Sequence, residues 1–366
     1  MDPPTLDIDL YHEGELNKAL TAEQEGGGVS FTHLIVSFDK YWRRLQVTAP
    51  RELSDPGRSV SNSIQASDLA KLLRGNKNEA GVEVMELHHL DIQGDLRPLM
   101  LAVSQQKQMT TFKSFSCQFD TNQFIDVLFE LPCLQNLGPW TDQFIPASKL
   151  SGLIQQGILR NLIVHPASPF FTEVLEADNF FHSVQNSLRL TTLDCSSVSF
   201  TDDYIDLVAR MLQRNSTLQN LTLGVGGNAK IRNIADSLRI NVSLKHLYVR
   251  LDLEPLKPDI MCFLDVLINE NKSLEALRVN KRGRSSVPTG LQKLQELVDF
   301  YLLLNRSGRN RLLRGNMNST GTITSQEWLD GIGNQEHLSV VFYFAQHNPF
   351  LILPLSLGGA VPRLPC

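Results

Sequence analysis

The amino-acid sequence predicts an α/β repeat protein in which short strands alternate with helices. The first observation is a nine-residue pattern, Asn-x-Ser/Thr-Leu-x-x-Leu-x-apolar, which occurs at 215–223, 241–249 and 271–279. The second is the apolar spacing of an amphipathic helix in the segments between these copies. The third is the length of 366 residues, which exceeds one compact core and favours several domains or one elongated array.

The repeat unit begins at the first apolar residue of a Leu-x-x-Leu-x-Leu core. Clear units begin at Leu190, Leu218, Leu244 and Leu274, and weaker copies begin at Val84, Met109, Leu134 and Leu159. The intervals of 25 to 31 residues are typical of a leucine-rich repeat. We expect the units at Leu134 and Leu159 to be irregular, because "LGPW" and "HPASPFF" interrupt them.

The segment 201–214 illustrates the helical half of a unit. Thr201 stands where a helix N-cap is expected, and Asp202 and Asp203 follow in the first turn, where negative charge favours the helix dipole. The apolar residues that fall on one face of this helix are Ile205, Val208, Met211 and Leu212.

Strands and helices alternating on this period resemble the ribonuclease-inhibitor-like type of leucine-rich-repeat protein. The resemblance covers residues 84–280 and implies a horseshoe-shaped solenoid, with a parallel sheet on the concave side and helices outside. The ninth position of this repeat type holds Asn or Cys, and only Cys117 conforms here. The repeats are therefore divergent.

Three asparagines of the repeat pattern, Asn215, Asn241 and Asn271, also spell glycosylation sequons. Each lies where a helix ends and the next strand begins, and Asn tolerates the left-handed backbone that stops a helix. The following Ser or Thr can satisfy nearby backbone groups. We therefore interpret the triplets as structural punctuation of the repeat and expect no glycan on them.

The two ends of the chain differ in charge and pattern from the repeats. We expect an acidic mobile tail at 1–28, an N-terminal cap at 29–83 and a basic, mainly helical C-terminal cap at 281–366. Residues 281–314 hold eight basic and two acidic side chains, in a chain of net charge −5. The stretch 298–350 resembles the tails of uncharacterised leucine-rich-repeat proteins of diatoms, which implies no activity.

The sequence also favours a cytoplasmic or nuclear protein. The N-terminus lacks the apolar core of a secretory signal, and no stretch of 18 uncharged apolar residues predicts a membrane span. The five cysteines are scattered without a Cys-x-x-Cys pair, which indicates reduced thiols.

No sequence pattern predicts catalysis, a metal or a cofactor. Residues 316–327 have the spacing of a calcium loop, but the first ligand position is Asn316 and the loop offers one carboxylate, from Glu327. We expect no calcium binding tighter than about 1 mM there. The "GVGGN" at 224–228 lacks the Lys-Ser/Thr of a phosphate loop and is interpreted as a repeat turn.

The remaining candidate is a binding surface on the concave face, where the third and fifth residues of each unit project. Its C-terminal half gathers basic and aromatic side chains, namely Lys245, His246, Tyr248, Arg250, Arg278, Arg306, Arg309 and Arg311. The first hypothesis is a non-enzymatic protein that binds an acidic protein partner there. The alternatives are a regulator of a nucleotide enzyme, like the GTPase-activating leucine-rich-repeat proteins, and non-specific nucleic-acid or phosphate binding by the basic segment.

Overall fold

The computed structural model describes residues 35–39, 44–48, 63–75, 82–141, 146–165, 170–226, 231–282, 289–309 and 338–347. The segment 1–28 and the calcium-like loop 316–327 lie outside the described residues, so these two expectations stay untested. Within the described residues the chain is α/β, with one large sheet whose strands are parallel apart from the first pair.

The large sheet has ten strands. Their order is β1 (Ile35–Asp39), β2 (Arg44–Thr48), β4 (Val84–His88), β6 (Thr111–Phe115), β7 (Asn136–Thr141), β8 (Asn161–His165), β9 (Thr192–Phe200), β10 (Asn220–Val225), β11 (His246–Leu251) and β12 (Ala276–Lys281). A second sheet pairs β3 (Ser63–Gln65) with β5 (Asp91–Gln93). Sequential strands from β6 onward are spatial neighbours, as expected of a repeat array.

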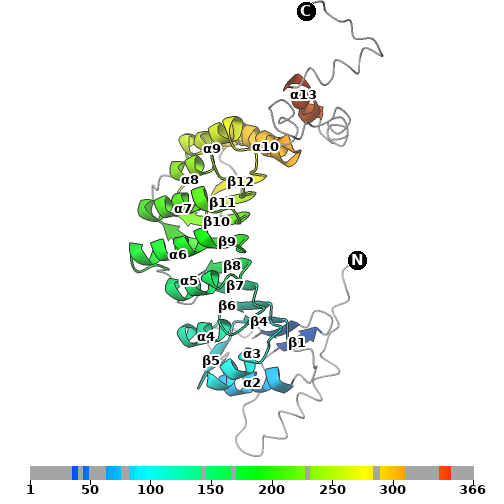
Figure 1. The fold of residues 1–366 in the computed structure, drawn as a ribbon, viewed down its shortest axis with the longest axis vertical. Coiled ribbons are helices and arrows are strands. Elements are labelled where there is room, and N and C mark those ends of the chain that lie inside the picture. The colour runs from blue at the N-terminus through cyan, green and yellow to red at the C-terminus, as the bar shows by residue number, and fades with distance from the viewer. Residues whose placement is uncertain are drawn as a thin grey trace, which may run out of the picture.

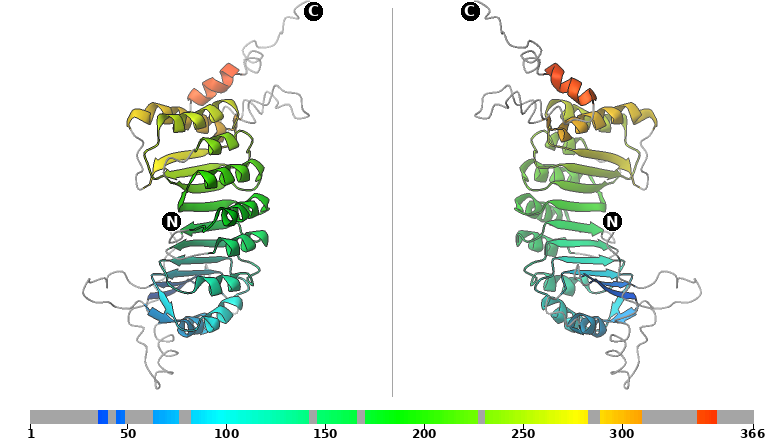
Figure 2. Two further views of the ribbon diagram at one scale, coloured as in Figure 1. Left: turned by 90° about the vertical axis from the view of Figure 1, so that its left-hand side faces the viewer. Right: turned by 90° about the vertical axis from the view of Figure 1, so that its right-hand side faces the viewer.

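Helices follow the strands and cover one side of the large sheet (Figures 1 and 2). They are α2 (Ala66–Gly75), α3 (Arg97–Ser104), α4 (Thr121–Leu128), α5 (Ala147–Gln155), α6 (Val174–Asn186), α7 (Asp202–Arg214), α8 (Arg232–Ser237), α9 (Lys257–Asn269) and α10 (Gln292–Arg306). A further helix, α13 (Leu338–His347), lies beyond the end of the stack and packs against α10. The stack bends so that the helices lie on its outer side and the strands on its inner side (Figure 1). We call the side of the large sheet that faces away from the helices the open face.

The core lies between the sheet and the helices. In β10, Leu221 and Leu223 are fully buried, and the predicted apolar face of α7 is buried with them, through Ile205, Val208, Met211 and Leu212. Thr201 stands at the N-cap of α7 as predicted, but its side chain makes no capping hydrogen bond.

Strand register confirms the unit boundaries from Met109 onward and corrects the first one. Thr111, two residues after Met109, pairs in register with Asn136, which is two residues after Leu134. Each later pair, up to Ala276, likewise joins residues that lie two positions after a predicted unit start. Thr111 also pairs with Val84, so the first unit begins at Val82 and not at Val84. A slip of two residues keeps each side chain on its face, because strand side chains alternate with period two.

The predicted irregularity is confirmed for the unit at Leu134, whereas β8 of the unit at Leu159 pairs with β9 without a register shift. The register of β7 shifts against both neighbouring strands, and Gly138 has φ +98°. A Cβ on Gly138 would lie 1.9 Å from the carbonyl oxygen of Ile163, so only glycine fits there.

The sequon asparagines form a buried ladder between the helix ends and the strand starts. The amide of Asn241 donates to the carbonyls of Leu212 (2.6 Å) and Asn215 (3.1 Å), while its Oδ1 accepts from the backbone N–H groups of Ser243 and Leu244. Asn271 repeats this arrangement one unit later.

These asparagines have a structural role, as predicted, but the predicted reason, a left-handed backbone conformation, was wrong. Asn215 has φ −73° and ψ 131°, which is extended and not left-handed. Asparagine is required because its amide can donate to two carbonyls and accept from two N–H groups at once.

The ladder continues past residue 280, where the sequence pattern predicted the last repeat to end. The amide of Asn305, in the last turn of α10, donates to the carbonyls of Leu274 (2.8 Å) and Asn271 (3.4 Å). Its Oδ1 is buried and accepts no hydrogen bond within the described part of the chain. Asn305 begins another Asn-x-Ser triplet, and this triplet could have predicted that the ladder continues.

Candidate partner-binding surface

The candidate surface lies on the open face, over β9 to β12. In β11, Leu247 and Val249 are buried against the helices, so His246, Tyr248 and Arg250 point to the opposite side. Tyr248 pairs in register with Arg278 of β12, which places both side chains in one row across the open face.

Two arginines on this surface have no carboxylate partner within the described residues. The Arg278 guanidinium lies over the Tyr248 ring, 5.9 Å from its centroid, and Nη1 of Arg250 donates to the Ser196 hydroxyl at 3.2 Å. Arg250 and Arg278 are exposed, and they are diagonal neighbours because Arg250 pairs in register with the residue two after Arg278. The two guanidinium charges and the ring, here named the Arg250–Arg278 surface, therefore face solvent together.

Three other basic side chains of the same repeats contact neighbouring polar side chains. Lys245 precedes β11 and pairs with Glu275 at 2.9 Å, and Lys281 lies 3.8 Å from Glu254. His246 contacts the Asn220 side-chain oxygen through Nδ1. Lys245 and His246 are thus held by neighbouring side chains, whereas Tyr248, Arg250 and Arg278 project as predicted.

A bulge of β9 forms one border of this surface. Cys195 pairs with Leu223 and Phe200 pairs with Val225, so four residues of β9, 196–199, oppose the single residue Gly224. A Cβ on Gly224 would lie 2.1 Å from the carbonyl oxygen of Val198. Glycine at 224 therefore allows the bulge to cross the open face above β10.

The bulge is anchored by a side chain three strands away in the sheet. Nη2 of Arg282, which follows β12, donates to the carbonyl oxygens of Ser196 (3.1 Å) and Val198 (3.5 Å). Nε of Arg282 also lies 3.6 Å from the Asp252 carboxylate, which accepts from the Ser199 hydroxyl at 2.8 Å. The sequence pattern did not predict this arrangement, since Arg282 and Ser196 are 86 positions apart.

Beside the bulge, His165, Ser196 and Asp194 come together without forming a catalytic triad. Nε2 of His165 lies 3.3 Å from the Ser196 hydroxyl and 3.6 Å from the Asp194 carboxylate. A triad needs the serine on one ring nitrogen and the carboxylate on the other. Burial raises the pKa of Asp194, but hydrogen bonds from His165 and Ser196 outweigh it and lower the pKa overall. The cluster therefore holds a charged carboxylate and positions the bulge.

The other half of the open face carries a neutralised cluster around Glu86. This carboxylate is 2% exposed and accepts hydrogen bonds from Arg44, while the Lys113 amine lies 2.7 Å from it. Burial raises the pKa of Glu86, but the bonds and charges of Lys113 and Arg44 outweigh that effect and lower it overall. Burial lowers the pKa of His88, whose Nε2 has no hydrogen-bond partner among the described residues. The cations here are already engaged.

The structure corrects the predicted position of Arg309. This side chain is 3% exposed, and its two terminal nitrogens donate to the carbonyl oxygens of Leu267 and Ile268 at 2.6 Å each. These carbonyls belong to the last turn of α9, where no intrahelical donor exists. The guanidinium also lies 5.1 Å from the Tyr301 ring centroid. Arg309 therefore caps a helix and cannot contact a partner.

Two predicted surface residues remain, Arg306 and Arg311. Arg306 is exposed at the end of α10, and Arg311 lies outside the described residues.

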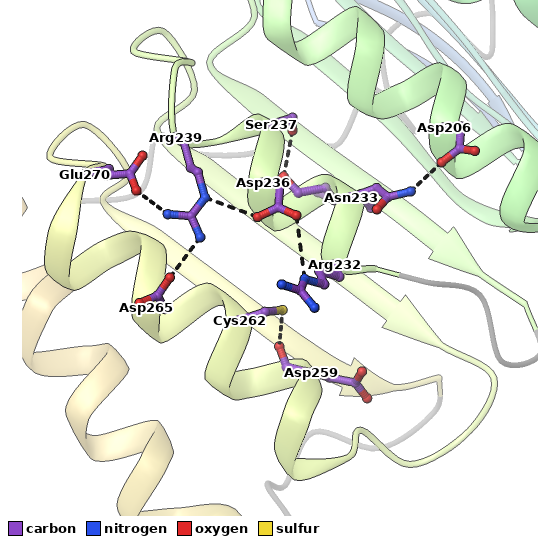
Figure 3. A network of polar contacts seen from close by, with 11 residues as sticks. Asp206, Arg232, Asn233, Asp236, Ser237, Arg239, Asp259, Cys262, Asp265 and Glu270 are labelled. Atoms are coloured by element: carbon purple, nitrogen blue, oxygen red, sulfur yellow. Dashed lines mark hydrogen bonds and ion pairs between the residues drawn. The ribbon is translucent and has the colours of Figure 1, made fainter.

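On the helix side of the same repeats, charge is compensated by a network between α8 and α9 (Figure 3). Arg239 contacts the carboxylates of Asp236, Asp265 and Glu270, and Asn233 donates to Asp206 of α7. Figure 3 shows these side chains linking successive helices. The network links neighbouring units, and the positive charge of Arg239 is paired with carboxylates.

Two structural absences apply to the described residues. They contain no cluster of His, Cys, Asp and Glu side chains suited to a metal ion. Among the helices described, none has the length and apolarity needed to cross a membrane.

No protein-family model and no curated protein matches this chain. Among solved structures, actin-binding site 2 of leiomodin-1 is similar at 16% identity and a TM-score of 0.37, over 45% of this chain and 90% of that one. The tropomodulin C-terminal domain of Caenorhabditis elegans is similar at 14% identity and a TM-score of 0.35, over 46% and 98%. Scores this low carry no functional argument.

Proposed function

We propose that this chain is a non-enzymatic binding protein of the leucine-rich-repeat type, which binds an acidic protein partner through the Arg250–Arg278 surface. We also propose that the repeats form a horseshoe-shaped solenoid and that a cap closes each of its two ends. The observation that carries it is the pair of exposed guanidinium groups without a carboxylate partner among the described residues, beside the Tyr248 ring.

The chemistry of these groups favours a carboxylate-bearing protein surface. A guanidinium presents N–H donors in a planar fork that matches a carboxylate, and tyrosine supplies apolar contact area with a polar tip. Arginine and tyrosine are also the residues that contribute most to protein interfaces. The anchored bulge holds this surface in shape, so little conformational freedom is lost on binding.

Non-specific binding to a nucleic-acid backbone is less favoured. That alternative relied on a cluster of arginines after residue 305, and Arg309 is buried as a helix cap. Regulation of a nucleotide enzyme would require a polar residue offered in trans, and no described feature singles one out.

The test is an affinity capture from cell extract with the wild-type chain and with the double variant Arg250→Glu/Arg278→Glu. Arg189→Glu is the matched control, because Arg189 is exposed and has no ion pair among the described residues. Bound proteins should then be purified and their Kd measured at two salt concentrations.

We expect the double variant to lose an acidic protein that the control retains, with affinity weakened about tenfold or more and with salt-sensitive wild-type binding. Parallel unfolding curves establish that each variant is folded. Retention of every captured protein at unchanged affinity would refute the proposal, and loss of capture after nuclease treatment would favour the nucleic-acid alternative.

A further inference from the structure

We infer that the acidic N-terminal segment 1–28 of this chain occupies the Arg250–Arg278 surface in cis and competes there with the partner. The inference rests on the proposed function, because it uses the same surface. The segment contains a single basic residue, Lys18, against seven acidic residues, Asp2, Asp7, Asp9, Glu13, Glu15, Glu23 and Glu25.

Charge complementarity favours this surface over the basic residues around Glu86 and over Arg239. Arg44 and Lys113 already contact the buried Glu86, and Arg239 contacts three carboxylates. Arg250 and Arg278 are adjacent on the open face and have no such partner among the described residues. Because these two unpaired guanidinium groups are neighbours on one face, an acidic segment can contact both of them at once there.

The chain is long enough to reach. The segment connects to β1 at Ile35, and eight strand-to-strand steps separate β1 from β11 in the large sheet. At about 4.8 Å per step this is about 38 Å. Glu15 lies twenty positions before Ile35. Twenty residues span at most about 70 Å when extended, and about 25 Å on average as a flexible chain.

Tethering makes even a weak contact effective. A short flexible tether holds a segment at an effective concentration on the order of 1 mM. If the detached segment bound with a Kd of about 100 µM, the tethered segment would occupy the surface about ten times as often as not. A competing acidic ligand would then bind about tenfold more weakly than to an unoccupied surface.

The probe is a fluorescently labelled synthetic peptide of residues 1–28, added to full-length protein and followed by anisotropy. One protein is the wild type. The other carries the seven acidic residues of the segment neutralised, with each Asp replaced by Asn and each Glu by Gln. Further full-length variants add either Arg278→Glu or the control Arg189→Glu to the neutralised chain. Arg278→Glu is chosen because the Arg278 side chain lies over the Tyr248 ring and has no hydrogen bond or ion pair among the described residues.

We expect the neutralised chain to bind the peptide about tenfold more tightly than the wild type does. Arg278→Glu should remove most of that gain, while Arg189→Glu should leave it within twofold. Equal peptide binding to the wild-type and neutralised chains would overturn the inference, as would binding that Arg278→Glu does not change.

Failure of the inference is distinguishable from failure of the proposed function. If the peptide does not bind but partner capture still depends on Arg250 and Arg278, the inference alone is wrong. If the peptide binds through Arg278 but no partner does, the proposed function alone is wrong. A wild-type chain that dimerises through the segment, seen by sedimentation and lost on neutralisation, would overturn the occupancy in cis.

Discussion

Replacing Asn241 by Ala tests whether the buried asparagine ladder, and not the sequon chemistry, explains the repeat pattern. Asn241 is 4% exposed, and its amide serves two carbonyls and two backbone N–H groups. The substitution leaves the Leu212 carbonyl and the N–H groups of Ser243 and Leu244 without this partner, while the Asn215 carbonyl keeps the Ser243 hydroxyl at 3.2 Å. A buried polar group that loses its partner costs about 1–3 kcal/mol.

The total cost is smaller than the sum of the costs of the separate groups, because the backbone can relax and water can enter, and because such contributions are not additive. We therefore expect Asn241→Ala to lower the free energy of unfolding by about 3–5 kcal/mol. Urea unfolding followed by circular dichroism and by fluorescence measures it, and coincidence of the two curves is needed because repeat arrays can unfold in parts.

Two further asparagines supply graded controls. Asn305→Ala should cost less than Asn241→Ala, because the Oδ1 of Asn305 has no donor among the described residues and only two carbonyls lose a partner. Asn220→Ala should cost under about 1 kcal/mol, since Asn220 is half-buried on the open face and water can replace it. A change within about 0.5 kcal/mol for Asn241→Ala, or the reverse order, would refute the reasoning.

Three other predictions concern stability. Leu221→Ala should lower the free energy of unfolding by about 2–5 kcal/mol, because Leu221 is fully buried and a cavity remains; an unchanged urea midpoint would mean that its position is misassigned. Arg309→Ala should cost about 2–4 kcal/mol, because two carbonyls of α9 lose charge-assisted bonds, whereas the exposed Arg306→Ala should change stability by under about 0.5 kcal/mol in the same assay. Acidification should destabilise the chain in two steps, since the pKa values of His88 and Glu86 lie below their ordinary values of 6.5 and 4.5 when folded. The unfolded state then binds more protons, so the loss begins below about pH 6.5 for His88 and below about pH 4.5 for Glu86. In Glu86→Gln the loss of stability below about pH 4.5 should be smaller. A pH profile identical to that of the wild type would contradict the assignment of this step to Glu86.

The sequence by itself determined the alternation of strand and helix and the face to which each strand residue points. Both depend on local periodicity, since side chains alternate in a strand and recur every 3.6 residues in a helix. For this reason Leu221, Tyr248 and Arg278 were placed correctly, and even the misplaced start at Val84 left Glu86 and His88 on the right face.

Only the tertiary structure decided which polar side chains serve the fold and which remain for binding. Arg309 and Arg278 look alike in the sequence, but Arg309 caps a helix that ends about 40 residues earlier, while Arg278 lies over a tyrosine ring with no hydrogen bond or ion pair among the described residues. Likewise, the bulge of β9 depends on Gly224 and on Arg282, which lie in later repeats. Such contacts join units distant in the chain, so no local period records them, and the charge left unpaired on the open face emerges only when the repeats are stacked.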